Sequence, residues 1–155
     1  MYICQRHLGF IFQSYNLLPG CTAAENVALP LMFKGVSKKT RDKVARELLR
    51  RVGLEKRADH YPGQMSGGQQ QRVGIARAFV TRPQVIFADE PTGNLDTKTT
   101  EEVMKVIQNF AREFHQTIIM VTHDPEMAVY ADRIIHMVDG NIIEDSKSMQ
   151  KNMSA

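Results

Sequence analysis

The sequence predicts an α/β fold that combines a mostly parallel β-sheet with an inserted helical segment. In the second half of the chain, short apolar runs of strand length alternate with stretches of helical periodicity, as in parallel α/β sheets. The part from about residue 22 to residue 81 differs, because its pattern is mostly helical and contains no strong strand signal. We therefore expect this part to form a helical insertion or subdomain.

The N-terminal third is expected to begin with a strand. Residues 8–13 form a short apolar run, and a polar loop with a Pro-Gly turn signal follows it. A helix is predicted over 22–32, because Thr22 and Glu25 have the spacing of a capping box. Pro30 is a candidate for an early end of this helix.

Two further helices are predicted in the middle of the chain. The first covers 37–52, carries its apolar residues on one face and stops at Gly53. After a loop over 57–64, the second helix covers 66–81 and is limited by Pro83.

The last third is expected to alternate strands and helices. The tail after Asp145 is polar, and we expect it to be loose. The predicted elements are a fully buried parallel strand within 85–91, a helix over 98–114, a strand over 117–123, a short helix with Pro125 in its first turn, and a hairpin over 133–143 that turns at Asp139-Gly140.

Composition and charge exclude several classes of protein. The chain has 155 residues, 43% hydrophobic and 24% charged, as in an ordinary soluble domain. No apolar run approaches the roughly 20 residues that cross a bilayer, and the N-terminus lacks the pattern of a signal peptide, so we expect a cytoplasmic location. The net charge of +3 comes largely from 34–57, where a solvated helix face is expected rather than a nucleic-acid partner. Cys4 and Cys21 lack metal-ligand spacing and are expected to be unpaired thiols.

Two carboxylates follow the apolar run at 85–88. Asp89 and Glu90 stand where the carboxyl end of a parallel strand presents side chains to a ligand. Such a pair can hold hydrated Mg²⁺ and accept a proton from an attacking water. An acidic turn without a function is the simpler explanation for these two residues taken alone.

Two other polar residues end apolar strands. His123 could donate a hydrogen bond to a γ-phosphate as negative charge shifts in a transition state. The amide of Gln13 could bind a metal or position water. Taken singly, a capping or loop histidine and a surface glutamine are the more common explanations.

The sequence SGGQ begins the helix predicted over 66–81. Ser66 and Gln69 have the spacing of a capping box, which is a sufficient structural reason for both. Gly67 and Gly68 need a further reason, because each costs roughly 1 kcal/mol relative to alanine in a helix. Close approach of an anion to bare backbone N–H groups at the positive helix end would supply it.

The order of these features resembles the nucleotide-binding domain of ATP-binding cassette (ABC) transporters, from the first residues to about Asp145. MSGGQ is similar to the family's signature motif, with Met65 where leucine is commoner, and VIFADE is similar to the Walker B strand. The stretch FQSYNLLPGCTAAENVALPL is similar to the subgroup serving lipoprotein release, macrolide export and antimicrobial-peptide export. The shorter matches are the D-loop (Asn94, Leu95, Asp96), the switch histidine (His123) and the Q-loop glutamine (Gln13).

This resemblance implies an ATPase subunit at the inner face of the cell membrane that drives a transmembrane permease. Two such subunits sandwich two ATP molecules in the family, and water attacks the γ-phosphate. Glu90 would be the general base, and Asp89 would hold Mg²⁺ together with Gln13, partly through water. His123 and Gln13 would also position charge and water. The signature residues would close over the γ-phosphate held by the second ATPase subunit, and Asp96 would link the two sites; these signature residues are Ser66, Gly67, Gly68 and Gln69.

The same resemblance divides the chain into parts of a P-loop NTPase (RecA-like) domain. Its sheet is expected to be incomplete and its helical subdomain inserted. The expected parts are the Q-loop strand and loop (1–21), the helical subdomain ending in the signature motif and its helix (22–82), the core with Walker B, D-loop and switch histidine (83–145), and the tail (146–155).

The family's phosphate loop, Gly-x-x-x-x-Gly-Lys-Ser/Thr, does not occur in the chain, because none of its ten glycines precedes a lysine. We therefore expect a truncated form that binds ATP weakly and does not hydrolyse it alone. In the family, the strand leading to this loop lies between the strands predicted at 117–123 and 133–138. Its absence leaves two apolar edges, which are expected to close on each other, to form a strand-swapped or edge-paired oligomer, or to make the chain poorly soluble.

Two alternatives stay open. A short protein could be a non-catalytic module that presents SGGQ to the phosphate loop of an intact ABC ATPase. A DNA-repair or chromosome-structure ATPase shares these motifs, but such proteins carry long coiled-coil insertions, and the chain has no sustained heptads.

Overall fold

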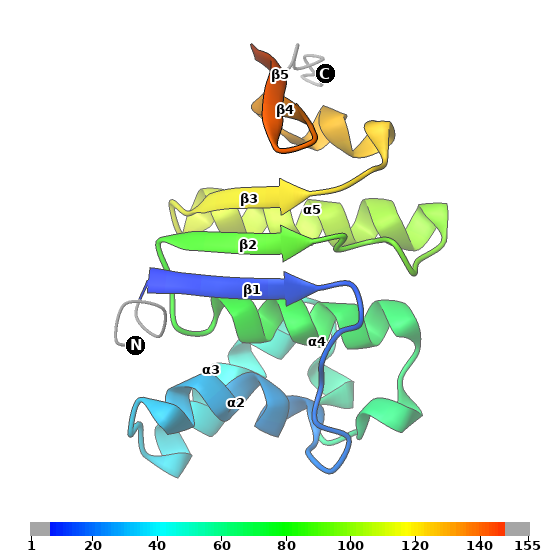
Figure 1. Cartoon of the computed structure of the whole chain (residues 1–155). Coiled ribbons are helices and arrows are strands. Elements are labelled where there is room, and N and C mark those ends of the chain that lie inside the picture. Colours follow the sequence, from blue (N-terminus) through cyan, green and yellow to red (C-terminus); the bar gives the residue numbers. More distant parts are fainter. Residues whose placement is uncertain (1–6, 148–155) are drawn as a thin grey trace, which may run out of the picture. The chain divides into compact units, whose positions relative to one another are not determined.

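The computed structural model describes residues 7–147, which divide after Val121 into two compact units that we describe separately (Figure 1). Within the described part, no helix is long and apolar enough to span a membrane. The first unit contains β1 (Leu8–Phe12), α2 (Ala23–Phe33), α3 (Lys38–Arg51), η1 (Glu55–Arg57), η2 (Pro62–Gln64), α4 (Gly67–Phe79), β2 (Val85–Asp89), α5 (Thr97–Glu113) and β3 (Thr117–Val121).

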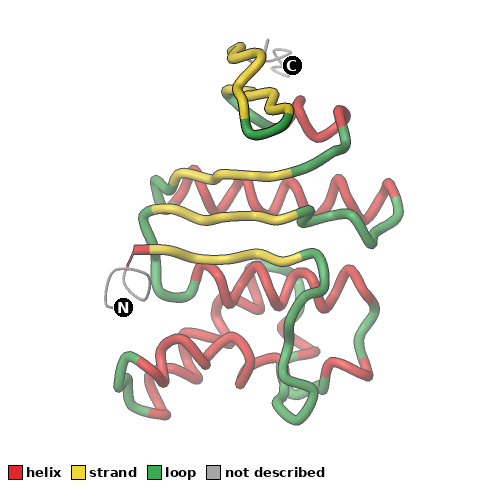
Figure 2. The backbone as a smooth tube through the Cα atoms, viewed as in Figure 1, coloured by secondary structure: helices red, strands yellow, loops and turns green. Residues whose placement is uncertain are grey.

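A parallel three-stranded sheet forms the centre of the first unit, with strand order β1-β2-β3 (Figure 2). Leu8 pairs with Val85 at the start of the strands, and Phe12 pairs with Asp89 at their end. Asp89 also pairs with Val121 of β3. The three carboxyl ends therefore meet at one edge, as the sequence predicts for a ligand site.

The prediction of a fully buried β2 is wrong, because only one face of this strand is covered. Ile86 and Ala88 are buried, whereas Val85 and Phe87 are partly exposed. Helices α4 and α5 run behind the strands in Figure 1, and α4 packs directly on β1. On the opposite face, Phe10 is 44% exposed and stacks on Phe87 with ring centroids 5.7 Å apart.

The hydrophobic core lies between the covered face of the sheet and the helices. Phe79 of α4 is fully buried and contacts the ring of Phe110 on α5 at a centroid distance of 5.1 Å. Helices α2 and α3 pack on each other and on α4 (Figure 1). The apolar face predicted for the helix over 37–52 is confirmed, because Leu48, Leu49 and Val52 are buried.

The helix boundaries follow their caps. Thr22 and Glu25 form the predicted capping box, and Gly53 follows α3 with a positive φ of 75°. Pro30, however, does not end α2, which continues to Phe33. A proline within a helix removes its own N–H donor and crowds the carbonyl four residues earlier, and packing on α3 and α4 carries α2 past it.

The loop predicted over 57–64 is more regular than expected. The 3₁₀ helix η1 includes Arg57, and η2 begins at Pro62. Proline suits the first position of such a helix, because its missing N–H would have no helical partner there. Asn26 of α2 anchors the earlier loop, since its buried amide bonds the backbone of Leu18 in both directions.

The second unit is small. It contains η3 (Pro125–Tyr130) and an antiparallel hairpin of β4 (Arg133–Val138) and β5 (Asn141–Lys147). Asp139 and Gly140 form the predicted turn with positive φ angles of 48° and 77°. Strand β5 continues to Lys147, so residues 146 and 147 belong to a strand and not to the predicted loose tail, and residues 148–155 lie outside the described part.

Candidate functional site

The candidate site begins at the carboxyl edge of the sheet. Asp89 is the last residue of β2 and is exposed, while Gln13 follows β1 directly. Because Phe12 pairs with Asp89, the two predicted metal ligands leave neighbouring strands at the same level. One carboxylate and one amide oxygen, completed by water and phosphate oxygens, suit Mg²⁺. The described residues contain no group of three or more His, Cys, Asp or Glu side chains that could hold a metal by themselves.

Glu90 occupies an unusual backbone conformation. Its φ is 44°, in the left-handed region, which costs a non-glycine residue about 1–3 kcal/mol. Two backbone hydrogen bonds hold it there: its N–H donates to the carbonyl of Val121 at 3.0 Å, and its carbonyl accepts from the N–H of Gly93 at 3.1 Å. Strain of this kind persists only where the surroundings determine it, so Glu90 is held in a defined turn.

Gln13 and the segment 93–96 meet at this edge. The Gln13 side chain donates to Asn94 Oδ1 at 3.4 Å, and Asn94 Nδ2 donates to the carbonyl of Gln13 at 3.2 Å. A Cβ at Gly93 would lie 2.7 Å from Gln13 Nε2, so any larger residue here would have to displace the end of the Gln13 side chain. The structure therefore brings together two segments that are 81 residues apart in the sequence.

The start of α4 lies against both of these segments. Ser66 caps the helix, with its Oγ accepting from the N–H of Gln69 at 3.4 Å. A Cβ at Gly67 would lie 2.7 Å from the hydroxyl of Tyr15, and a Cβ at Gly68 would overlap Cγ2 of Thr99. Close packing is thus a reason for both glycines that the sequence argument, which considered only an anion, did not identify.

Asp96 caps the next helix. Its Oδ1 accepts from the N–H of Thr99 at 3.0 Å, and its Oδ2 accepts from the Thr99 hydroxyl at 2.7 Å. The bond from the Thr99 backbone, followed by that from its hydroxyl, lowers the pKa of Asp96, which keeps this carboxylate charged. Leu95 lies next to Gly67, with its Cδ2 3.8 Å from a Cβ placed there.

The family to which these features point is decided by comparison with known sequences. The family described as "ABC transporter" matches residues 2–93, which include Gln13, the SGGQ sequence, Asp89 and Glu90. The chain belongs to the ABC transporter family.

Relatives of this ABC transporter chain include macrolide export ATP-binding/permease proteins MacB. The protein from Shigella flexneri is 49% identical over 147 residues, which are 95% of this chain and 22% of the relative. The protein from Marinobacter nauticus is 51% identical over 138 residues, which are 89% of this chain and 21% of the relative. The chain thus spans about a fifth of the length of these relatives.

Solved ABC cassettes share the fold. A dimeric post-hydrolysis structure of the ATP-binding cassette MJ0796, bound to ADP and Pi, has a TM-score of 0.81 and 45% identity, and the match covers 92% of this chain and 63% of that one. A second dimeric MJ0796 structure has a TM-score of 0.82 and 46% identity, covering 94% and 64%. The predicted fold class, an α/β P-loop NTPase fold, is confirmed.

His123 belongs to the second unit of the ABC transporter chain. The predicted strand over 117–123 ends at Val121, so His123 lies outside it and before η3. Its role stays a prediction, as do the roles of the other site residues.

Three residues that support the site were missed in the sequence. Arg77 of α4 donates to the carbonyls of Tyr15 at 2.9 Å and Asn16 at 2.5 Å, both of which have positive φ angles. Burial lowers the pKa of Arg77. A polar residue on the buried face of a helix was the available signal, and it also applies to the fully buried Gln71. No local pattern indicates that Tyr15 lies against Gly67.

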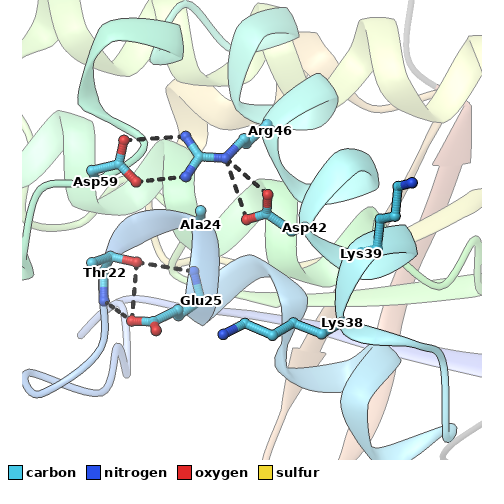
Figure 3. Close-up of a pocket in the computed structure, with 8 residues that line it drawn as sticks. All are labelled: Thr22, Ala24, Glu25, Lys38, Lys39, Asp42, Arg46 and Asp59. Carbon is cyan, nitrogen blue, oxygen red and sulfur yellow. Dashed lines mark hydrogen bonds and ion pairs between the residues drawn. The ribbon is translucent and has the colours of Figure 1, made fainter.

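A pocket of about 630 Å³ lies apart from these residues, between the start of α2, the first half of α3 and Asp59 (Figure 3). Arg46 bridges Asp42 at 3.1 Å and Asp59 at 2.6 Å, and these partners raise its pKa. Glu25 bonds back to Thr22, which lowers the pKa of Glu25. None of the predicted site residues lines this pocket.

Proposed function

We propose that the chain is the ATP-hydrolysing part of an ABC transporter, which couples attack of water on ATP to transport through a membrane permease. One observation carries the proposal: the turn of Asp89 and Glu90, the Gln13 side chain and the SGGQ helix start lie in one unit around the carboxyl edge of one parallel sheet. The relatives' names, macrolide export ATP-binding/permease proteins, support the same activity and make an exported small molecule the favoured cargo.

In this proposal each site residue has a defined role. Glu90 accepts a proton from the attacking water, while Asp89 and Gln13 hold Mg²⁺, partly through water. When bound, the ion would neutralise charge on the phosphates. His123 stabilises charge on the γ-phosphate. The phosphate of a second subunit's ATP rests on the start of α4, where Ser66, Gly67, Gly68 and Gln69 present backbone N–H groups and side chains.

The proposed partners are a second ABC ATPase subunit and a transmembrane permease, which would place the chain at the inner face of the cell membrane. The dimeric state named for the MJ0796 structures supports the first. Segments 93–96 and 66–69 lie together in the structure and form the face proposed for the dimer.

We assign residues 22–82 to the helical subdomain and 83–145 to the core.

These 155 residues alone are expected to bind MgATP with a dissociation constant weaker than about 1 mM, because they contain no Gly-Lys phosphate loop, whose amides and lysine cradle phosphates. Isothermal titration calorimetry on the purified chain measures this. Adding an intact cassette should restore binding of nucleotide. The same mixture tests the alternative of a non-catalytic module. An ATP-dependent complex in which only the partner's general base supports ATP hydrolysis would favour the module. Micromolar binding by the chain alone would contradict the expectation.

The outer edge of β3 is a further proposed contact. Within the described residues, β3 pairs with β2 in the first unit, and β4 pairs with β5 in the second unit, while closure of the sheet between β3 and β4 stays a prediction. We propose that the 155 residues form edge-paired or strand-swapped oligomers through β3, on which Ile119 is 44% exposed.

Ile119→Lys should therefore shift the 155-residue chain towards monomer in size-exclusion chromatography with light scattering, because charge on an edge strand blocks pairing. Phe33→Lys is the matched control, since Phe33 is a 75% exposed apolar residue on α2. Equal shifts for both variants would mean that general surface polarity, not the edge, controls association.

A further inference from the structure

Gln71 is a polar side chain in the core. It lies on α4, two residues beyond Gln69, and is 0% exposed. Its Nε2 donates a hydrogen bond to the carbonyl of Pro91. Its Oε1 is buried and has no hydrogen-bond partner among the described residues.

The bonded carbonyl belongs to the residue directly after Glu90. Proline has no N–H, so this carbonyl is the one backbone polar group through which Pro91 can be held. Glu90 itself is fixed by its bonds with Val121 and Gly93. Gln71 therefore adds a further bond to the turn, and this bond comes from the helix that carries the SGGQ sequence.

Packing alone explains Gln71 poorly. A buried amide with one unpaired polar atom is unfavourable for folding, whereas a methionine of similar length would fill the space without leaving Oε1 unsatisfied. Replacing the amide would, however, leave the Pro91 carbonyl without this partner, and Glu90 sits next to it in a left-handed conformation. The hydrogen bond is thus directed at the turn whose geometry the chemistry needs.

We infer that Gln71 is a positioning residue that holds the Glu90 turn in register with the signature helix. The inference rests on the proposed role of Glu90 as general base. Gln71 lies five residues from Ser66 on a rigid helix, about 7.5 Å along its axis. A single helix then carries the SGGQ sequence at its start and, about one and a half turns later, the residue that holds the Glu90 turn. Movement of the SGGQ sequence would therefore move the Glu90 turn.

The first test is Gln71→Met in a cassette in which a phosphate-loop segment is joined to this chain, assayed with MgATP. We expect kcat to fall about 10-fold to 100-fold, as for other residues that orient a catalytic group, with KM within about 2-fold of wild type and an unchanged melting temperature. Gln70→Met is the matched control, because Gln70 makes the same kind of bond to Met65 within its own helix start. An unchanged kcat would overturn the inference. A lower kcat accompanied by a changed KM and a lower melting temperature would overturn it as well.

The second test does not depend on turnover. Hydrogen exchange of a peptide covering 89–93 reports the amides of Glu90 and Gly93, which bond across this turn. In Gln71→Met these amides should exchange about 10-fold faster, because loosening the turn opens them, while Gln70→Met leaves them unchanged. Equal exchange in wild type and Gln71→Met would refute the positioning contact. A wild-type protein without ATPase activity would instead refute the proposed function, and the exchange result would still decide the role of Gln71.

Discussion

Replacing Glu90 with glutamine is expected to lower the rate of ATP hydrolysis by about 10²-fold to 10⁴-fold, because a glutamine cannot accept the proton of the attacking water. The amide has nearly the shape of the carboxylate, and the two backbone bonds that hold Glu90 do not involve its side chain. The turn should therefore persist, and ATP should still bind. Single-turnover hydrolysis by a cassette in which a phosphate-loop segment is joined to this chain, together with its nucleotide affinity, measures both effects.

Glu101→Gln is the matched control for this experiment. Glu101 lies on α5, is exposed, and forms a 3.7 Å ion pair with Lys105 one turn away. Its neutralisation should leave hydrolysis unchanged. If Glu90→Gln hydrolysed ATP as fast as the control, another group would have to be the base, and the assignment of the site would fail.

Features that depend on neighbours in the sequence could be predicted. The capping boxes at Thr22 and Ser66, the stop at Gly53 and the turn at Asp139-Gly140 are all set within a few residues, and all are present. Parallel pairing also followed from the alternation of strands and helices. For the same reason, Gln13 and Asp89 are predicted at one edge of the sheet, and the pairing of Phe12 with Asp89 agrees.

Features that depend on distant segments could not be predicted. Nothing near Pro30 indicates that α2 will continue, because the packing that sustains it comes from α3 and α4. The open face of β2 was not predicted for a similar reason. A run of apolar residues does not by itself show whether other elements cover one face of the strand or both. The contacts of Gly68 are also long-range, and its neighbour Thr99 is 31 positions away in the sequence.

Because of this contact, we expect Gly68→Ala to lower both the stability of the protein and its rate of ATP hydrolysis. A Cβ at Gly68 would approach Cγ2 of Thr99 well inside the 3.0 Å that real Cβ atoms require, so either the Thr99 side chain leaves its bond with Asp96 or α4 and α5 shift. Overpacking costs about 1–3 kcal/mol, and the better helix propensity of alanine returns about 1 kcal/mol, so we expect a net loss of up to about 2 kcal/mol in chemical denaturation. Hydrolysis should fall about 100-fold, because the displaced N–H groups at the helix start no longer meet the phosphate.

Two further variants identify the cause. Gly74→Ala makes the same change later in α4, where a Cβ would find its nearest neighbour at 3.6 Å, and it should be neutral or stabilising. In Gly68→Ala/Thr99→Ser, the clashing methyl group is gone while the hydroxyl that bonds Asp96 remains, so stability should return to at least the wild-type value. If stability returns but hydrolysis does not, the bare backbone of Gly68 serves the phosphate directly, and packing against α5 explains only part of the need for glycine. If neither returns, the Thr99 contact does not control the start of α4.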